Sequence, residues 1–523
     1  MNIKILDCTL RDGGYVNNWD FGKNIAEKML FCINKSGVEY TEVGFLQNTE
    51  YNTEKTLFNE IHQINTIVPY NQILNTKIVA MIVYGKFNER KIIHKNEGIK
   101  LDAIRVTFKK NEISSVFNYL KKVKDCGYEL FVNPTNIELY SDNELLSIIE
   151  KVNKLKPYAF SIVDTNGVLK EKDVIRLTYL IDNNLASDIA LCFHSHNNLQ
   201  LSFSNAQCLM KICKSREIII DSTVFGMGRG AGNLCTELIT QYINDNYDGH
   251  YDIVPILKIV DEQINPIFAK TPWGYSVPYY LAATNHCHPN YAKYLVDKQT
   301  VPVEVINKLL QAIPDNKKSE YDINLIRQIY LDNFSAIIDD SEIVQELKQK
   351  LSNKNILIMA PGKTLNDEKS KILQFIHDKN PFVISLNFLP RDFNCNTAFV
   401  SNIKRFSLIN DHNKPILVTS NIANVPINAK ILNYSSYLNH SKLYDNAALM
   451  CLKLLMNIGV KETNIAGLDG FSSIPTKNYI SNDLINNAKE GEFDERNKIM
   501  SEELKKISAK IKLNFITKTQ YLV

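Results

Sequence analysis

The sequence predicts an α/β protein with three parts: a TIM (β/α)8 barrel, a helical post-barrel segment, and a C-terminal Rossmann-like α/β domain. Short apolar, β-branched runs alternate with amphipathic stretches in the first part of the chain. This alternation stops in the middle of the chain and resumes near Asn353. The length of 523 residues allows about three domains. We therefore expect domains at residues 1–246, 247–350 and 351–523.

Strand candidates in the first domain number eight, and all but Tyr128–Asn133 are followed by a helical pattern, beginning with Asn24–Ser36 and Glu54–Ile67. Eight βα units in about 245 residues match the usual size of a TIM barrel, whose active site lies at the carboxyl ends of the strands. Polar residues at those ends are therefore candidates for the active site. The strand candidates are Ile3–Leu6, Glu39–Phe45, Lys77–Val83, Asp102–Phe108, Tyr128–Asn133, Ala159–Asp164, Asp188–His194 and Glu217–Ser222.

The middle of the chain carries helical periodicity, as in Val303–Ala312 and Tyr321–Phe334. Aromatic and histidine side chains cluster just before these runs. We expect most of them to pack as a helical core, although a histidine here has a suitable pKa for proton transfer at the barrel rim. The cluster consists of Trp273, Tyr275, Tyr279, Tyr280, His286, His288 and Tyr291.

The charge balance argues for small-molecule chemistry, because Lys+Arg 60 against Asp+Glu 57 leaves a net charge of only +3. Such a chain has no global field for nucleic acid or a membrane surface. Ten cysteines without a CxxC pair favour a reducing compartment. The polar N-terminus and the absence of about 18 consecutive apolar residues speak against a signal peptide and a membrane span. We expect a cytoplasmic homo-oligomer.

Two histidines end the seventh predicted strand, in Phe193-His194-Ser195-His196. Because alternate residues of a strand point the same way, His194 and His196 present neighbouring imidazoles at the rim, a natural edge for a divalent metal. Two histidines that only satisfy a strand end are the alternative.

The first predicted strand ends in a charged segment, Arg11-Asp12-Gly13-Gly14. In a closed barrel Asp12 can complete a two-histidine, one-carboxylate metal site, and Arg11 beside it can stabilise an anion or an enolate. An ordinary surface Arg–Asp pair is the alternative. The loop after the eighth strand is rich in glycine, and we expect Gly228 and Gly230 to let the backbone approach a ligand.

Five motifs in order, LDCTLRDGG, YTEVGF, VDTNG, FHSHNNLQLSFSNA and FGMGRGAGN, resemble those of the DRE-TIM metallolyase (HMG-CoA lyase-like) superfamily. The resemblance covers about the first 245 residues. It implies a divalent ion, Mg²⁺ or Mn²⁺ and in some members Zn²⁺ or Co²⁺, bound by Asp12, His194 and His196. It further places Asn233 at or near the metal, Glu42 near the metal and Arg11, and Thr165 at the carboxylate of a 2-oxo acid.

Within the superfamily the glycine loop GMGRGAGN is similar to that of the 4-hydroxy-2-oxovalerate aldolases. Those aldolases have a histidine base three residues after the metal aspartate, where this chain has Tyr15. We interpret the barrel as a metal-dependent aldolase that joins or separates a pyruvate-like 2-oxo acid and an aldehyde, with Arg11, Tyr15 and Glu42 as catalytic residues. A Claisen-type acyl-CoA enzyme and a non-catalytic scaffold are the alternatives.

The C-terminal domain begins with a strand, a glycine turn and a helix at Ala360-Pro361-Gly362-Lys363-Thr364. Unpaired amides at a helix start favour an anion. The segment, with PFVISLNF and the stretch ending in AGLDGF, resembles the Rossmann-type scaffold of some bacterial sialyltransferases. From the strand–glycine–helix entry and the second strand–glycine element at AGLDGF we expect a nucleotide or nucleotide sugar near Gly362, and with it a role in surface-glycan precursor metabolism. A domain for assembly or cover is the alternative.

Overall fold

The computed structural model describes residues 2–68, 74–334, 338–409, 414–439, 443, 445–474, 477–484 and 491–521. The chain forms two compact units. Unit 1 comprises Met1–Pro289 with Lys318–Glu320, and unit 2 comprises Asn290–Lys317 with Tyr321–Val523. The division into three domains at residues 246 and 350 stays a prediction.

Unit 1 holds a closed barrel of parallel strands, as predicted. The first strand, β1, pairs with the last, β9, through Ile5 and Ile220, and with β2 through Leu6 and Tyr40, which closes the ring. A two-residue strand, β3 (Leu57–Phe58), adds to β2 outside the ring. The eight ring strands are β1 (Ile3–Asp7), β2 (Tyr40–Leu46), β4 (Lys77–Val83), β5 (Ala103–Phe108), β6 (Glu129–Pro134), β7 (Ala159–Asp164), β8 (Ala190–Ser195) and β9 (Ile218–Ser222).

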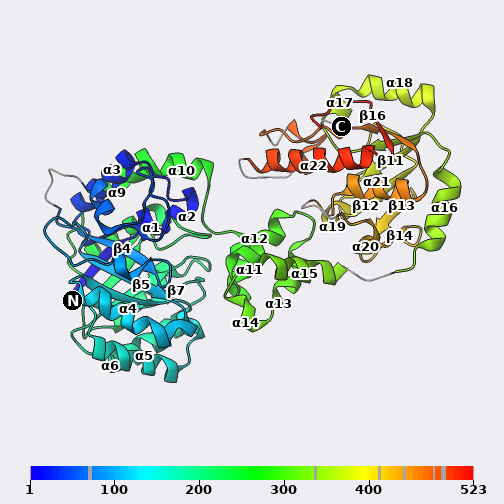
Figure 1. The fold of residues 1–523 in the computed structure, drawn as a ribbon. Helices are drawn as coiled ribbons and strands as arrows, with labels where there is room; N and C mark the ends of the chain where they lie inside the picture. Colours follow the sequence, from blue (N-terminus) through cyan, green and yellow to red (C-terminus); the bar gives the residue numbers. More distant parts are fainter. Residues whose placement is uncertain are drawn as a thin grey trace. The chain divides into compact units, whose positions relative to one another are not determined.

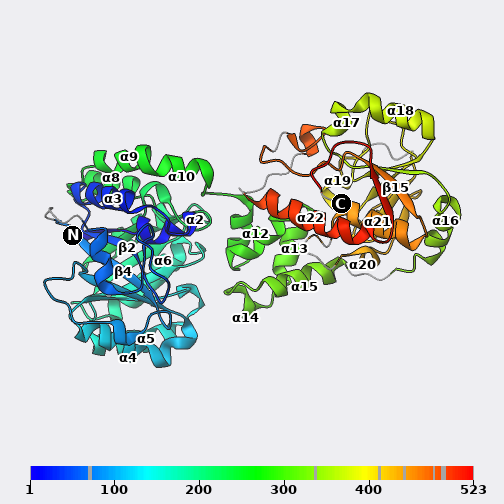
Figure 2. The ribbon, with the colours of Figure 1, turned by 45° about the horizontal axis from the view of Figure 1, so that its top comes forward.

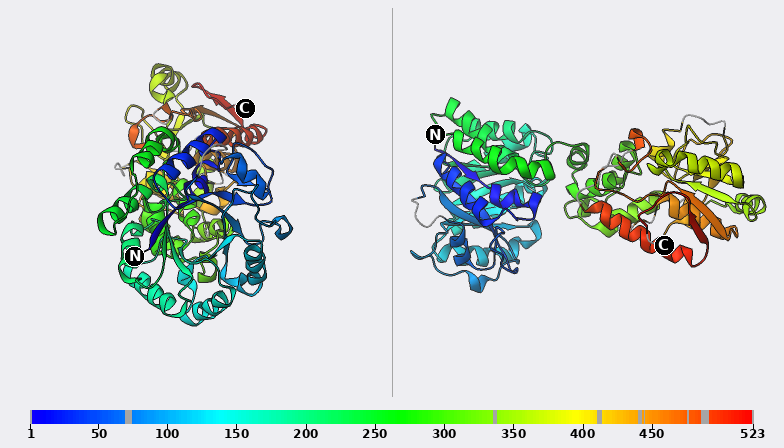
Figure 3. Two further views of the ribbon diagram at one scale, coloured as in Figure 1. Left: turned by 90° about the vertical axis from the view of Figure 1, so that its left-hand side faces the viewer. Right: turned by 90° about the horizontal axis from the view of Figure 1, so that it is seen from above.

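Helices cover the outside of the barrel (Figures 1 and 3). Figure 2 shows α3 and α8 on one side of β2 and β4, and α4 and α5 on the other. Each helix buries one apolar face, and α5 also begins with a capping box in which Ser141 and Glu144 bond each other's backbone amides. The barrel helices are α3 (Lys23–Lys35), α4 (Ile113–Asp125), α5 (Asp142–Leu155), α6 (Glu171–Asn184), α7 (Ser202–Ile212) and α8 (Thr236–Asn246).

The inside of the barrel has two chemically different layers. Apolar side chains such as Tyr40, Val79 and Phe131 fill one layer. Charged side chains fill another, centred on Arg105, which is completely buried. Because a buried charge is costly unless it is paired, this second layer identifies the part of the barrel that serves chemistry.

The predicted helix Glu54–Ile67 is wrong. The chain there forms β3 and a short 3-10 helix, Ile61–Thr66. Hydrogen bonds from Phe45 to the carbonyl of Thr56, and from Thr56 to the carbonyl of Trp19, tie this segment to the barrel rim. Tertiary pairing thus overrides the local periodicity.

The segment after the barrel is helical, as predicted. In unit 1 it contains α9 (Val254–Ile259), a π-helical turn at Val260–Ile264, α10 (Asn265–Lys270) and α11 (Val277–Thr284). The helices that follow are α12 (Pro289–Asp297), α13 (Val303–Gln311), α14 (Asp315–Lys318), α15 (Ile323–Phe334) and α16 (Ser341–Leu351).

Unit 2 contains a second, open parallel sheet, in the order β14-β13-β12-β11-β10-β15-β16. Its strands are β10 (Ile356–Met359), β11 (Phe382–Leu386), β12 (Thr397–Val400), β13 (Ile416–Thr419), β14 (Lys430–Leu432), β15 (Glu462–Ala466) and β16 (Lys512–Phe515). The chain leaves β10 toward one edge and returns at β15 on its other side, so the strand order reverses between β10 and β15. The predicted α/β domain is confirmed.

Helices of unit 2 pack on its sheet and on one another. The apolar helix α21 packs on β12, and the charged helix α22 packs on α21. Among the described helices after β10, α17, α19 and α20 have four residues each, and α18, α21 and α22 are longer (Figure 1). These helices are α17 (Thr364–Asp367), α18 (Lys369–Lys379), α19 (Ile403–Phe406), α20 (Tyr434–Tyr437), α21 (Ala447–Asn457) and α22 (Glu492–Ser508). Across the described residues, no helix combines the length and apolarity needed to cross a bilayer.

Candidate active site

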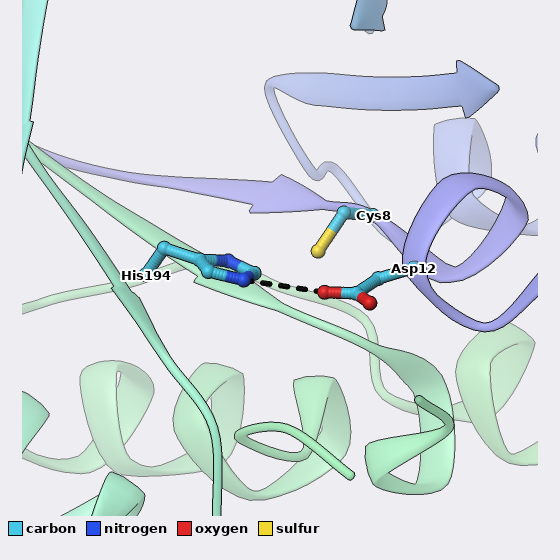
Figure 4. Close-up of side chains that lie close together, drawn as sticks. All are labelled: Cys8, Asp12 and His194. Carbon is cyan, nitrogen blue, oxygen red and sulfur yellow. Dashed lines mark ion pairs between the residues drawn. The ribbon is translucent and has the colours of Figure 1, made fainter. Parts of the chain in front are cut away.

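Asp12, His194 and His196 meet at the carboxyl end of the barrel. Asp12 ends the short helix α1 (Thr9–Asp12) directly after β1, whereas the histidines lie at the end of β8. Oδ2 of Asp12 lies 3.2 Å from Nε2 of His194 and 3.8 Å from Nε2 of His196. All three side chains are buried. Figure 4 shows His194 and Asp12 facing each other, with Cys8 beside them.

Asp221, at the end of β9, orients His194. Nδ1 of His194 lies 2.9 Å from Oδ2 of Asp221, which leaves Nε2 directed at Asp12. Although burial lowers the pKa of His194, its hydrogen bonds to Asp12 and Asp221 raise it overall. Burial lowers the pKa of His196 to about 3, so its imidazole stays neutral. A second carboxylate behind a histidine is the usual support of a histidine that binds metal.

Arg11 and Arg105 connect the carboxylates of this layer. Nε of Arg11 donates to Oε2 of Glu42 at 2.7 Å, and its Nη1 lies 3.1 Å from Asp12. Arg105 donates to Glu42 at 3.4 Å and also to Asp221. Burial opposes ionisation of Asp12, but Arg11 and the histidines hold its pKa well below the usual range. Arg11 is only 5% exposed and Asp12 only 1%, so they do not form an ordinary surface pair.

The donor set fits a divalent cation. Two arginines against three carboxylates leave this buried group one negative charge in excess when the histidines are neutral, and a buried charge of this kind requires a partner. Within the described part of the chain, Oδ1 of Asp12 and Oε1 of Glu42 are buried without a hydrogen-bond partner. Imidazole nitrogen and carboxylate oxygen suit Mn²⁺, Zn²⁺ and similar ions.

Cys8 is a side chain that the sequence did not single out. Its thiol and the ligand atoms of Asp12 and His194 all lie within 4.8 Å of one another. However, Sγ of Cys8 lies 3.2 Å from the carbonyl of Ser222, and burial raises the pKa of the thiol well above its usual value. A thiol that remains protonated is a poor metal ligand, so the histidines and Asp12 are the stronger donors.

The other predicted residues lie around this centre. The backbone of Asn233 pairs with that of His196 in an isolated antiparallel β-bridge, and the buried Oδ1 of Asn233 has no hydrogen-bond partner among the described residues. Thr165 directly follows β7 and is half-buried, with its Oγ1 accepting from the amide of Asn136 at 2.8 Å. Gly230 has a φ of 69°, which favours glycine, whereas a Cβ on Gly228 would lie 2.2 Å from Nδ2 of Asn233. Gly228 therefore makes room for Asn233, and its predicted role at a ligand stays a prediction.

Arg229, between these two glycines, is a charged residue that the sequence analysis passed over. Its guanidinium donates to Nε2 of His288 at 3.3 Å and to the carbonyl of Thr165 at 3.4 Å, and it lies 5.7 Å from the ring of Tyr15. Tyr15 is 42% exposed, yet desolvation raises its pKa, so the phenol stays protonated. The signal was present in the sequence: an arginine in an otherwise small-residue loop.

His288, from the aromatic and histidine cluster, does come to the barrel rim. Burial and the neighbouring Arg229 lower its pKa to about 3. Its imidazole is therefore neutral and accepts from Arg229. This arrangement makes His288 a support for Arg229 rather than a free base.

The first part of the chain is similar to known proteins. Residues 2–261 match the HMGL-like family model, so this part of the chain, which contains the barrel, belongs to that family. It is 22% identical over 281 residues to an oxaloacetate decarboxylase of Mycobacterium tuberculosis, covering 52% of this chain and 79% of that protein. It is 23% identical over 279 residues to a 4-hydroxy-2-oxovalerate aldolase of Bacillus cereus, covering 51% and 76%.

Among solved structures, a variant carboxyl transferase domain of Rhizobium etli pyruvate carboxylase, solved with pyruvate, has a similar fold. The TM-score is 0.50 at 12% identity, over 66% of this chain and 65% of that one. The predicted resemblance to the HMG-CoA lyase-like superfamily is thus confirmed. The aldolase and lyase relatives support a metal-dependent carbon–carbon lyase. The sialyltransferase resemblance stays a prediction.

Proposed function

We propose that unit 1 is an aldolase that makes or breaks the bond between the methyl carbon of a pyruvate-like 2-oxo acid and the carbonyl carbon of an aldehyde. The observation that carries this proposal is the convergence of Asp12, His194 and His196 beside Arg11 at the carboxyl end of the barrel. It combines a divalent-metal donor set with a fixed cation.

Asp12, His194 and His196 would hold the ion, with Asp221 keeping His194 oriented. A divalent cation at this position supplies positive charge next to the enolate oxygen that forms during the reaction. Arg11 supplies a second positive charge from a guanidinium that Glu42 holds in place. Fixed charges of this kind stabilise the enolate more than the neutral substrate, which lowers the barrier.

The carboxylate of the 2-oxo acid would lie between Thr165 and Arg229. Arg229 already reaches the backbone of Thr165, and His288 accepts from its guanidinium. Arginine binds carboxylates through paired N–H donors. Thr165 was predicted to bind the carboxylate of the 2-oxo acid, and the proposal adds Arg229 as a positively charged partner for the same carboxylate.

Tyr15 would exchange a proton with the oxygen of the aldehyde. Catalysis would start from the Tyr15 phenolate, after the phenol has lost its proton to solvent. In condensation the phenolate takes a proton from the methyl group of the 2-oxo acid, and the phenol then donates this proton to the aldehyde oxygen while the enolate carbon forms the new bond. In cleavage the phenolate takes the proton of the hydroxyl, the carbon–carbon bond breaks with its electrons in the enolate, and the phenol returns the proton to the enolate carbon, which gives pyruvate. Arg229 and Arg11 favour this phenolate.

Decarboxylation of a 2-oxo dicarboxylic acid is the second candidate, because the Mycobacterium tuberculosis relative carries that name. Loss of carbon dioxide from such an acid leaves the same enolate, and Arg11 would stabilise it in the same way. The two reactions differ in the leaving fragment, so the substrate distinguishes them. The cytoplasmic location and the homo-oligomeric state stay predictions.

The test measures pyruvate release from 4-hydroxy-2-oxo acids of increasing chain length and from oxaloacetate. A separate assay measures cleavage of a 3-hydroxy-3-methyl acyl-CoA thioester. Each is measured after chelation and after addition of Mn²⁺ or Mg²⁺. We expect metal-dependent release from at least one hydroxy acid, and its loss in His196→Ala. Activity on oxaloacetate alone would favour decarboxylation, and cleavage of the thioester alone would overturn the proposal.

A further inference from the structure

The barrel has an uncharged side across from the candidate metal site. Around the closed ring, β9, β8 and β7 separate β1 from β6 in one direction, and β2, β4 and β5 separate them in the other. The strand β6 therefore lies opposite β1, which the helix with Asp12 follows. The neighbouring strands β5 and β6 pair with Thr107 beside Asn133, near the carboxyl ends of both strands.

The side chains of Thr107 and Asn133 point into the barrel, because alternate residues of a strand share a direction. Arg105 on β5 points inside, where it donates to two buried carboxylates, so Thr107 points inside as well. Phe131 on β6 belongs to the apolar layer inside the ring, so Asn133 also points inside. The pair therefore faces the space in which the proposed reaction would take place.

The amide of Asn133 is buried without a partner. The residue is only 2% exposed, and its Oδ1 accepts no hydrogen bond from the described residues. Thr107 is half-buried, and its hydroxyl is likewise unbonded within the described part of the chain. An unpaired buried polar group costs free energy, and a ligand that bonds to it removes this cost. The pair is thus suited to bond a part of the substrate.

The neighbours of this pair in the sheet are uncharged. Val83 on β4 lies beside Thr107. The pairing of β6 with β7, continued by two residues, places Ser161 beside Asn133. These four side chains form an uncharged row across the strands β4 to β7.

Charged side chains on and after β5 and β6 have partners of their own. Arg105 donates to two buried carboxylates. Lys109 and Lys110, after β5, are exposed, and each pairs with a glutamate. Glu138, after β6, accepts from a neighbouring asparagine side chain at 3.4 Å. The row therefore favours uncharged hydroxyl groups over a second carboxylate, because a hydroxyl and an amide each donate and accept hydrogen bonds.

The proposed position of the aldehyde directs its substituent toward this row. Tyr15, on α2 (Gly14–Asn17) after β1, would exchange a proton with the aldehyde oxygen, while Thr165 and Arg229 would bind the carboxylate of the 2-oxo acid. The substituent on the carbonyl carbon then points away from Tyr15, across the barrel toward β5 and β6.

We infer that the aldehyde is a hydroxyaldehyde, such as a short sugar, and that Thr107 and Asn133 select it by bonding its hydroxyl groups. This inference rests on the proposed aldolase function. An aldehyde without these hydroxyl groups is disfavoured, because it leaves the buried amide unpaired. A sugar-like aldehyde would fit the expected role in glycan-precursor metabolism, which stays a prediction, as does a nucleotide near Gly362.

The experiment compares the condensation of pyruvate with 2,3-dihydroxypropanal and with propanal, which differ only in two hydroxyl groups. The full chain is assayed with added Mn²⁺, and the product is quantified by chromatography. The ratio of the two kcat/KM values measures the preference for the hydroxyaldehyde. Because the two aldehydes also differ in intrinsic reactivity, the decisive quantity is the change in this ratio between the parent and a variant.

Thr107→Val and Asn133→Leu should each lower this ratio about tenfold, the scale for losing one hydrogen bond to the substrate. Thr178→Val is the matched control. Thr178 is a buried threonine whose Oγ1 also has no partner among the described residues, but it lies on α6, outside the barrel. This control should keep the ratio of the parent.

Urea unfolding separates substrate binding from a structural role of Asn133. Because its amide has no partner among the described residues, Asn133→Leu should keep or raise the midpoint of unfolding. If this variant does not fold, the ratio in Thr107→Val decides. An unchanged ratio in the folded variants overturns the inference and leaves the aldolase proposal standing. No product from either aldehyde with the parent protein overturns both.

Discussion

The two parallel sheets of this chain both carry polar residues at their carboxyl ends, but they treat charge differently. In the barrel, Arg105, Glu42 and Asp221 are essentially inaccessible to water, and Arg105 donates to both carboxylates. At the open sheet, Arg327 and Arg496 are half-buried around a cavity of about 850 Å³. Closure of the sheet into a barrel explains the difference, because every second side chain of each strand then points to the barrel axis, where these side chains meet and exclude water. An open sheet provides only one crevice, and helices outside the sheet supply its charges.

Arg105→Met gives the largest expected effect and tests this comparison most directly. It leaves Glu42 and Asp221 without their shared cation, which should destabilise unit 1 by about 3–5 kcal/mol. Urea unfolding followed by circular dichroism measures the change. Arg496→Met at the open sheet is the matched substitution and should cost less than about 1 kcal/mol. Equal losses in the free energy of unfolding would show that a charge inside the closed barrel contributes no more to stability than a charge at the open sheet.

Arg11→Lys tests whether the buried cation beside Asp12 acts in catalysis rather than in folding. The lysine keeps the charge but loses the Nε contact to Glu42, and kcat should fall by about 10²–10³ with the fold retained. Steady-state kinetics on the best substrate of the panel, with circular dichroism of the variant, measures both. Arg176→Lys on the barrel surface is the control. A kcat near that of the parent would refute the role.

Asp221→Asn removes the carboxylate behind His194 while preserving its shape. We expect divalent-metal affinity to weaken about 10–100-fold, the usual effect of losing such a support. Competition with a chromogenic chelator provides the measurement. Asp182→Asn serves as control, because Asp182 pairs with Arg216 on the outside of the barrel. Unchanged metal affinity would mean that Asp221 pairs with Arg105 but does not support His194 as a metal ligand.

His288→Gln gives the smallest expected effect, on the pH dependence of stability. The unfolded chain protonates this histidine near pH 6.5, while the folded chain resists protonation until about pH 3. Acidification below pH 6.5 therefore favours unfolding. Because glutamine takes up no proton, the variant should lose less stability between pH 6.5 and 4.5, by up to about 2 kcal/mol. Urea midpoints at several pH values measure it, and parallel curves would contradict the assignment.

The barrel strands and the candidate metal site were predictable because their signals are local. Alternation along β8 places His194 and His196 side by side, and the βα rhythm places Asp12 at the same rim. The segment Glu54–Ile67 was not predictable, because backbone bonds to Trp19 and Phe45 determine its structure. Periodicity carries no information about such distant partners.

By itself, then, the sequence determined the order of the ring strands, the residues that gather at the candidate metal site, and the family. Only the tertiary structure decided which charges neutralise one another: Arg105 with Glu42 and Asp221, Arg229 with His288, and Asp469 with the start of α17. The physical reason is that strand and helix periods depend on neighbours in the chain, whereas burial and charge pairing depend on neighbours in space. The residues of the unit 2 cavity, which come from helices and strand ends far apart in the sequence, belong to this second kind.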